Sequence, residues 1–253
     1  MRSSILMLAG AAAWLQASVA LSEPRQLPAG VRATLSGFVS EHDGMELVLV
    51  PSGRFTMGSD SGRHDERPAH AVDLDAFLID RQEVTNGQFG RFVTETSYRP
   101  KGAWKSSDAK DRAQQPVTLV TFADASAYAQ WAGRRLPTEA EWERAAAVGG
   151  VLGMTGGVWE WTRDWYDRFA YAARANVVTK NPHGPADGAE VEERFRTSKG
   201  GNERSTRKVV RGGPSIGGPK ELARVSRRAA MNPTHWAEDT GFRCVLSLPG
   251  SGG

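Results

Sequence analysis

Three helix-start signals, all between residues 85 and 141, constrain the fold of this chain more than any other feature of its sequence. In each of them a threonine is followed three residues later by a side chain that can reach back to it. The pairs are Thr85 with Gln88, Thr121 with Asp124, and Thr138 with Glu141. Such capping boxes satisfy the free N–H groups of a first turn, and each cap contributes about 1 kcal/mol. The sequence therefore predicts three helices in its middle third.

Apolar residues follow each cap at helical spacing, which predicts the face that each helix buries. The predicted buried residues are Phe89, Phe92 and Val93, then Ala127, Tyr128 and Trp131, and finally Trp142, Ala145 and Ala146.

Strands are predicted on both sides of these helices. "MELVLVPSGRFTMGS", from Met45, has two apolar runs split by a Pro-Ser-Gly turn, which predicts a hairpin. "VDLDAFLIDRQEV" alternates and predicts another strand. "VWEWTRDWY" repeats tryptophan with a period of two, and "KVVRGG" and "GFRCVLSL" are short apolar runs. The whole predicts an α+β fold with much irregular chain, in one domain.

The first twenty residues have the pattern of a signal peptide. Arg2 precedes an apolar run at 5–15 that is too short to span a bilayer, and Ser18-Val19-Ala20 is a small-x-small cleavage signal. We expect cleavage after Ala20, a periplasmic or secreted product and no membrane anchor; an uncleaved anchor is the alternative. The predicted organisation is leader 1–20, a loosely held arm 21–44, a domain 45–248 and a tail 249–253.

Charge argues against a nucleic-acid partner. The chain has 32 Lys and Arg against 29 Asp and Glu, so its formal net charge is +3, and loss of the leader with its one arginine leaves +2. Acids flank the basic cluster at 194–211, and an exported protein seldom meets nucleic acid. Residues 186–208 are charged and Gly/Ser-rich, and we expect a surface insertion there.

The only cysteine is Cys244, so the chain cannot form an internal disulfide and its stability must come from packing. Two interpretations remain open: a small buried hydrophobe, or a free exported thiol with a role in chemistry. Arg243 is adjacent, but neighbours on a strand point to opposite faces, and a reactive thiol needs exposure and nearby positive charge.

Several segments together resemble the formylglycine-generating-enzyme (sulfatase-modifying factor) family. They are "MELVLVPSGRFTMGSD", "DERPAHAVDLDAFLIDRQEVTNGQFGRFV", "RLPTEAEWERAA", "GGVWEWTRDWYD", "NPHGPADG", "VVRGG" and "GFRCV", in that family's order and over most of 45–248. The resemblance implies an irregular C-type-lectin-like fold with short sheets, few helices and long loops.

The resemblance also shows what is missing. Family members that oxidise a sulfatase cysteine use two cysteines after Arg-Gly-Gly, which bind copper; here those positions fall near Gly217 and Leu222. We therefore expect neither copper nor the cysteine-dependent formylglycine reaction. In many relatives the cysteine of "GFRC" pairs with one at the position of Ala129, so its partner is absent too.

Calcium is the one cofactor that the resemblance leaves open, as a weak candidate. The loop that carries one family site is missing after Gly149. A second site would use Glu160 with the carbonyl groups of Gly156 and Val158, but Gly153 stands where the family has an asparagine ligand. Calcium prefers six to eight oxygen ligands.

His235 is the candidate general base, because an imidazole titrates near neutrality; a plain surface histidine is the alternative. Trp159 is a candidate for substrate binding, against a core role for the tryptophans of 159–165. His64 and His70 could hold a metal, but a solvated loop explains them more simply.

Arg211 and Arg224 are also substrate-binding candidates. Guanidinium groups match carboxylates in a two-bonded geometry, so they suit an anionic ligand. Alternatively, they pair with acids of the domain itself, such as Asp164, Glu160 and Glu141.

Three functions fit the sequence. The first is an accessory or maturation protein for another exported protein. The second is an oxidoreductase that acts on a small molecule, of the kind that matures a siderophore chromophore. The third is a non-catalytic, lectin-like module whose groove binds a peptide or a glycan.

Overall fold

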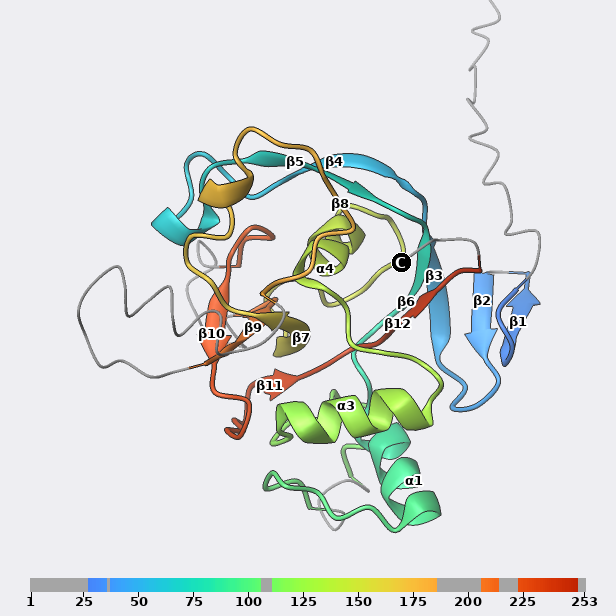
Figure 1. The fold of residues 1–253 in the computed structure, drawn as a ribbon. Coiled ribbons are helices and arrows are strands. Elements are labelled where there is room, and N and C mark those ends of the chain that lie inside the picture. Colours follow the sequence, from blue (N-terminus) through green and yellow to red (C-terminus); the bar gives the residue numbers. More distant parts are fainter. Residues whose placement is uncertain (1–26, 36, 106–110, 186–205, 214–222, 250–253) are drawn as a thin grey trace, which may run out of the picture.

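The computed structural model describes residues 27–35, 37–105, 111–185, 206–213 and 223–249 (Figure 1). The helices of this part are α1 (Asn86–Thr96), α3 (Phe122–Trp131) and α4 (Glu139–Ala146), with short 3-10 turns at His64–Glu66 and Ala172–Arg174. The strands of the first half are β1 (Val31–Thr34), β2 (Gly37–Ser40), β3 (Glu46–Val50), β4 (Gly53–Met57), β5 (His70–Leu74) and β6 (Phe77–Asp80). Those of the second half are β7 (Trp159–Trp165), β8 (Thr179–Lys180), β9 (Lys208–Arg211), β10 (Ala229–Met231), β11 (Thr240–Gly241) and β12 (Val245–Ser247).

The strands form three small sheets. One has the order β1-β2-β3-β6-β12, the second β10-β9-β7-β11 and the third β4-β5-β8. This is the expected α+β architecture of short sheets, few helices and long connections. Among the described helices, none is both long and apolar enough to cross a membrane.

The predicted hairpin at Pro51-Ser52-Gly53 is wrong. Strand β3 pairs with β2 and β6, whereas β4 pairs with β5 in another sheet. The turn therefore carries the chain from one sheet to the next. Both runs bury apolar residues, Val50 in the first and Met57 in the second, and a turn sequence alone does not say which partner each strand takes.

The loosely held arm predicted at 21–44 is corrected from Val31 onward. Strands β1 and β2 form a hairpin that extends the five-stranded sheet, and Phe38 lies opposite Leu47 of β3. Val31 and Phe38 also pack against the main core. Burial of these apolar side chains holds this part of the arm to the domain, since about 25 cal/mol is gained per Å² removed from water.

All three capping boxes form as predicted, with the threonine hydroxyl and the reciprocal side chain both engaged. The predicted buried faces are correct in their centres: Phe89, Phe92, Tyr128, Trp142 and Ala145 are buried. The flanking residues Val93, Ala127, Trp131 and Ala146 are only half-buried.

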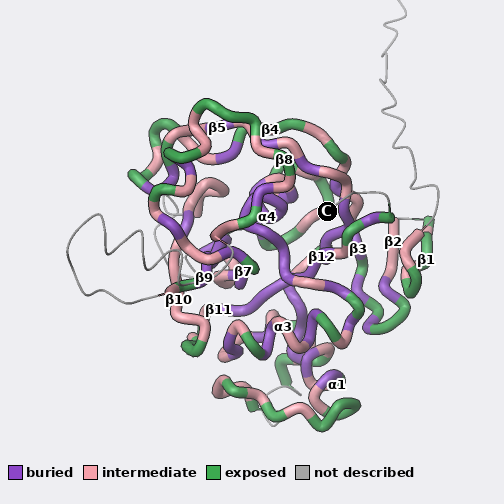
Figure 2. The backbone as a smooth tube through the Cα atoms, in the orientation of Figure 1, coloured by how far each residue is buried: buried purple, intermediate pink, exposed green. Residues whose placement is uncertain are grey.

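The core has two parts, shown as purple segments in Figure 2. One lies around α1 and α3 and contains Phe89, Tyr128, Trp161 and Phe242. The other surrounds α4 and contains Trp142, Met57 and Tyr171. Helix α4 contacts β4 of the three-stranded sheet and β7 and β9 of the four-stranded sheet, so it packs between these two sheets.

Candidate functional site

The Arg-Gly-Gly sequence at the end of β9 lies against the indole of Trp159. The backbone of Gly212 has a φ of +95°, and a Cβ atom on Gly213 would overlap the Trp159 ring. Glycine is required at both positions, by conformation at the first and by close approach at the second. We call the surface around Trp159, Gly213 and Arg227 the Trp159 face.

Trp159 itself is half-buried, and it packs against the main core. The guanidinium carbon of Arg227 lies 5.2 Å from its ring centroid, a cation–π distance. The Trp159 backbone N–H donates to the carbonyl of Asp239 at 2.7 Å. Trp159 therefore packs against the core and also leaves part of its side chain exposed to solvent.

Arg211 is a fully buried internal cation rather than an exposed ligand-binding group. It has 0% exposed surface. Its guanidinium donates to Glu139 at 2.7 Å, to Glu143 at 2.5 Å and to the Tyr171 hydroxyl at 3.2 Å. In this structure the prediction that Arg211 binds substrate is therefore not supported, because two carboxylates already occupy the group.

Arg211 also donates to the carbonyl of Val225. Arg211 precedes the segment 214–222 and Val225 follows it, so this bond joins the two described ends of that segment. Arg211 therefore ties together the described residues on either side of the segment in which the family carries its reactive residues. Gly217 and Leu222, the positions that replace the family's cysteines, lie outside the described residues.

Arg224 is anchored at the same place but keeps part of its surface. It donates to Glu66 at 2.6 Å, and the Ser226 hydroxyl donates to the other oxygen of Glu66 at 2.9 Å. Glu66 is fully buried, whereas the Arg224 side chain is 39% exposed. Of the two candidate arginines, only Arg224 can reach a ligand without moving.

The internal-pairing interpretation of the arginines holds, but with other acids. Arg228 bonds Glu139 through Nε at 2.6 Å and through a terminal nitrogen at 2.9 Å. The carboxylates bonded by Arg211, Arg224 and Arg228 are those of Glu139, Glu143 and Glu66. Arg211 and Arg228 lower the pKa of Glu139 to about 2, although its burial acts in the opposite direction.

His235 is exposed in the turn before β11. Its backbone N–H donates to the carbonyl of Asn232 at 2.9 Å, and its ring has no bonding partner among the described residues. The next residue, Trp236, is 47% exposed. Within the described chain no contact joins His235 to Trp159, Arg211 or Arg224, so these candidates do not form one preassembled catalytic group.

The resemblance suggests calcium at Glu160, but the guanidinium of Arg243 already binds this carboxylate. Arg243 donates to both of its oxygens, at 2.6 and 2.8 Å, and the Trp142 indole N–H donates at 2.9 Å. Gly156 and Val158 instead lie next to Gly212. The Gly156 N–H donates to the Gly212 carbonyl at 2.9 Å, and a Cβ atom on Gly212 would meet the Val158 carbonyl oxygen at 3.0 Å.

This donor set does not suit calcium. No group of three or more His, Cys, Asp or Glu side chains is placed to hold a metal ion in the described part of the chain. A Cβ atom on Gly153 would meet the carboxylate of Glu83, which fills the space beside that glycine. Burial, together with the nearby Glu160, raises the pKa of Glu83 to about 7. Arg243 supplies the positive charge that a metal ion would otherwise bring.

Cys244 is buried, with 0% exposed surface. Burial and the neighbouring Asp80 raise the pKa of its thiol well above the ordinary value. Ala129 belongs to the same core cluster. A buried thiol that resists ionisation is poorly suited to act as a nucleophile at neutral pH.

His70 does not lie in a solvated loop, contrary to the prediction. It is 3% exposed in β5, and its ring centroid lies 4.6 Å from that of Tyr171 in an edge-to-face contact. Burial is the main reason that the pKa of His70 is lowered. The sequence predicts that this strand begins at Val72. In the structure β5 begins at His70, and its alternation of buried and half-buried residues starts there.

Lys208 was missed by the sequence analysis. Its ammonium lies 3.7 Å from the Trp165 ring centroid and 4.5 Å from that of Phe122, and it donates to the Arg163 carbonyl at 2.7 Å. Burial lowers its pKa to about 8. The buried acids Glu139, Glu143, Glu66 and Glu83 were missed as well, because charged residues on a predicted helix or loop usually face water.

Comparison with known proteins identifies the family of this chain. The sulfatase-modifying factor enzyme 1-like domain model matches residues 36–151 and 148–248. The chain is 27% identical to a formylglycine-generating enzyme of Thermomonospora curvata, over 79% of this chain and 92% of that one. It is 30% identical to the serine/threonine-protein kinase pkn1 of Chlamydia pneumoniae, over 80% of this chain, but it spans only 38% of the kinase's length.

Solved structures agree on the fold. PvdO from Pseudomonas aeruginosa superimposes with a TM-score of 0.59 at 20% identity, over 88% of this chain and all of that one. Treponema denticola variable protein 1 gives 0.59 at 17% identity, over 87% of this chain and 98% of that one. These likenesses are structural, whereas the domain model covers nearly all of the chain after residue 35. The chain therefore belongs to the sulfatase-modifying factor enzyme 1-like domain family, as its motifs indicated.

Proposed function

We propose that this protein is an exported accessory or maturation factor that acts on another periplasmic protein, without the cysteine chemistry of formylglycine formation. The single observation that carries the proposal is the state of Cys244. It is the only cysteine of the chain, and its thiol is buried and resists ionisation. Because the cysteine route needs a pair of thiolates, this chain cannot follow it.

The family scaffold is nevertheless maintained around the Trp159 face. Gly213 packs on Trp159, and Arg211 joins the two ends of the 214–222 segment through Val225. Arg224, which precedes β10, and Trp236, which follows it, stay partly exposed. A recognition surface that keeps its frame but lacks the reactive thiols supports a role in binding and assisting a partner.

The experiment is a deletion strain complemented with defined variants. We expect one exported enzyme to be present at normal amount but inactive in the deletion strain, and to regain activity with the wild-type chain. Cys244→Ser should restore activity equally, in the presence of a copper chelator. Trp236→Ala should restore it less well, since it removes an exposed aromatic group from the recognition surface.

Other results would point elsewhere. Formation of an aldehyde in a sulfatase-type peptide by the purified mature chain would refute the proposal. A change in the absorbance of a small quinoid substrate, with no exported enzyme affected, would favour the small-molecule oxidoreductase. Binding of a partner whose activity never changes would favour the lectin-like module.

A further inference from the structure

A cavity of about 550 Å³ lies away from the Trp159 face, where the start of α4 meets the β5–β6 turn and strand β8. Its apolar wall consists of Leu74, Ala76 and Phe77. The same cavity is also lined by Arg163 and Lys180. Apolar and cationic side chains that line one cavity together suit an amphiphilic anion.

The charges of this cavity do not balance. Its lining contains three permanent cations, Arg135, Arg163 and Lys180, and two acids, Asp75 and Glu141. Arg135 bonds Glu141 through two nitrogens, both at 2.7 Å, and Lys180 lies 3.2 Å from Asp75. The excess positive charge is therefore at Arg163.

Arg163 is exposed on β7, between the buried residues Thr162 and Asp164. Its guanidinium has no hydrogen-bond or ion-pair partner within the described part of the chain, whereas Arg135, the other arginine of this cavity, is paired with Glu141. An incoming carboxylate can therefore bond Arg163 without displacing any acid among the described residues, and a guanidinium–carboxylate pair is a strong, directional contact.

The wall of the cavity is held in place before any ligand arrives. The Asp75 N–H donates to the Asn181 side-chain oxygen at 2.9 Å, and the Asn181 amide donates back to the Asp75 carboxylate at 2.8 Å. Asn181 also takes a φ of +43°, which asparagine tolerates better than most residues. A site fixed in this way loses little conformational freedom on binding.

From this arrangement we propose that the cavity binds a ligand that carries a carboxylate beside an apolar chain, with Arg163 and Lys180 on the carboxylate and Leu74, Ala76 and Phe77 against the chain. The inference goes beyond the proposed function and holds whether or not the protein is a maturation factor. The carboxylate can belong to a small free molecule or to a peptide.

The test is a titration of the mature protein followed by two-dimensional NMR. One arm uses hexanoate, with hexanamide as the uncharged counterpart. The other uses a terminally blocked Leu-Glu-Leu peptide, with Leu-Gln-Leu as its counterpart. We expect saturable shifts around the cavity with the charged member of at least one pair, and weaker binding with its neutral counterpart.

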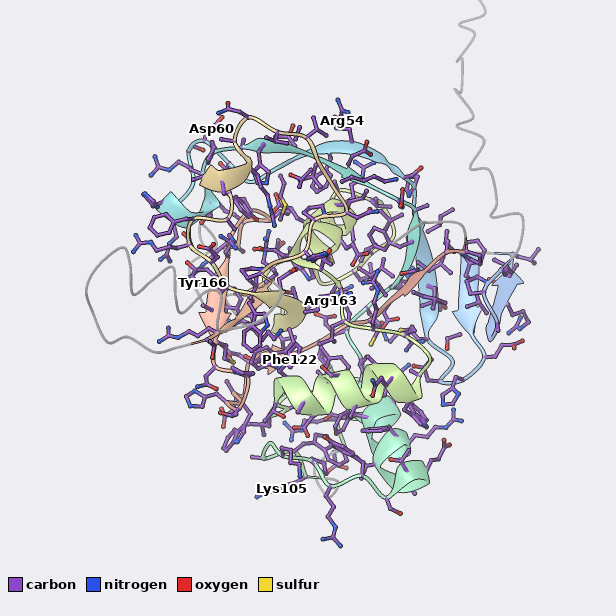
Figure 3. The ribbon with its side chains drawn as sticks, viewed as in Figure 1. Arg54, Asp60, Lys105, Phe122, Arg163 and Tyr166 are labelled. Atoms are coloured by element: carbon purple, nitrogen blue, oxygen red, sulfur yellow. The ribbon has the colours of Figure 1, made fainter. Side chains whose placement is uncertain are left out.

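Arg163→Gln should weaken that binding about tenfold, the equivalent of one charge-assisted hydrogen bond. Arg54→Gln is the matched control, because Arg54 is also exposed on a strand and does not line the cavity. Figure 3 labels both residues, on opposite sides of α4 in that view. Lys180→Gln is a second variant on the same wall, in case Arg163→Gln does not fold.

Binding of hexanoate would indicate a free ligand, and binding of the Leu-Glu-Leu peptide alone would indicate a peptide-borne carboxylate; both support the site. If neither charged probe binds saturably, the proposal is wrong. It is also wrong if the cavity variant that folds, Arg163→Gln or Lys180→Gln, binds as tightly as Arg54→Gln. Loss of partner maturation in the deletion strain is a separate measurement, so the two proposals can fail independently.

Discussion

Arg243 and Glu160 form a two-bonded ion pair at the centre of the molecule, with N–H···O distances of 2.6 and 2.8 Å and no exposed surface on either side chain. Two further bonds fix the pair: Trp142 donates to Glu160, and Arg243 donates to the Leu152 carbonyl at 2.8 Å. The pair thus ties strand β7 to helix α4 and to the loop that follows it. It also occupies the carboxylate that the family resemblance offered to calcium.

Removal of one partner should be costly. Arg243→Met leaves Glu160 and Glu83 buried without their shared cation, and such a change costs about 3–5 kcal/mol. Urea unfolding monitored by circular dichroism measures it. Arg91→Met is the control, because Arg91 pairs with Glu95 on the exposed side of α1 and such a pair contributes about 1 kcal/mol or less. Equal losses in both variants would show that the buried pair has no special role.

Calcium should not stabilise the mature protein. Arg243 already neutralises Glu160, and the described residues offer no cluster of acid ligands. We expect the same thermal midpoint in millimolar calcium and in a chelator. A midpoint that rises with calcium concentration would mean that a site exists despite the guanidinium, since a ligand that binds only the folded state raises stability.

Stability should fall as pH rises from about 4 to 7. Burial raises the pKa of both Asp80 and Glu83 to about 7, so the folded state holds protons that the unfolded state has already released. The contribution of these two carboxyl groups to the unfolding free energy then decreases with pH over that interval and levels off above it. Urea unfolding at pH 5 and pH 8 measures the difference.

Glu83→Gln provides the internal comparison for this pH effect. The amide keeps the shape of the protonated acid, so the variant should lose less stability between pH 5 and pH 8 than the wild type. Asp43 and Glu139, with pKa values of about 2 that are lowered by arginine partners despite burial, act in the opposite sense. They weaken the fold only below about pH 4. An unchanged slope in Glu83→Gln would contradict the assignment.

Cys244→Ser should fold and keep its function. A hydroxyl in an apolar slot costs about 1–2 kcal/mol. In the native wild type the buried thiol should not react with a disulfide reagent at pH 8, and it should react once denaturant is added. A folded but inactive Cys244→Ser protein, or rapid native labelling, would show that the thiol has a chemical role.

Gly213→Ala should disturb the Trp159 face. The added Cβ would overlap the Trp159 indole, and overpacking of this kind costs about 1–3 kcal/mol. Tryptophan fluorescence and the thermal midpoint should both change. Gly149→Ala is the control, because a Cβ there meets no atom within 4 Å. Similar behaviour of the two variants would mean that Gly213 is not needed for close approach.

The sequence alone determined the features that depend on neighbours along the chain. Each capping box involves residues three apart, so Thr85, Thr121 and Thr138 could be assigned without the fold. The family motifs were equally local, and the count of one cysteine excluded a disulfide and a thiol pair at once.

The tertiary structure alone decided which distant residues meet. The turn at Pro51-Ser52-Gly53 was visible, but only the fold shows that it changes sheets, because strand pairing depends on partners far along the chain. From the sequence, Arg211 could bind a ligand or pair with an acid of the domain, and only the fold shows that it bonds Glu139, 72 residues away. The charge of a side chain follows from its residue type alone. Whether water, a ligand or a buried acid compensates that charge depends on which distant residues the folded chain places beside it.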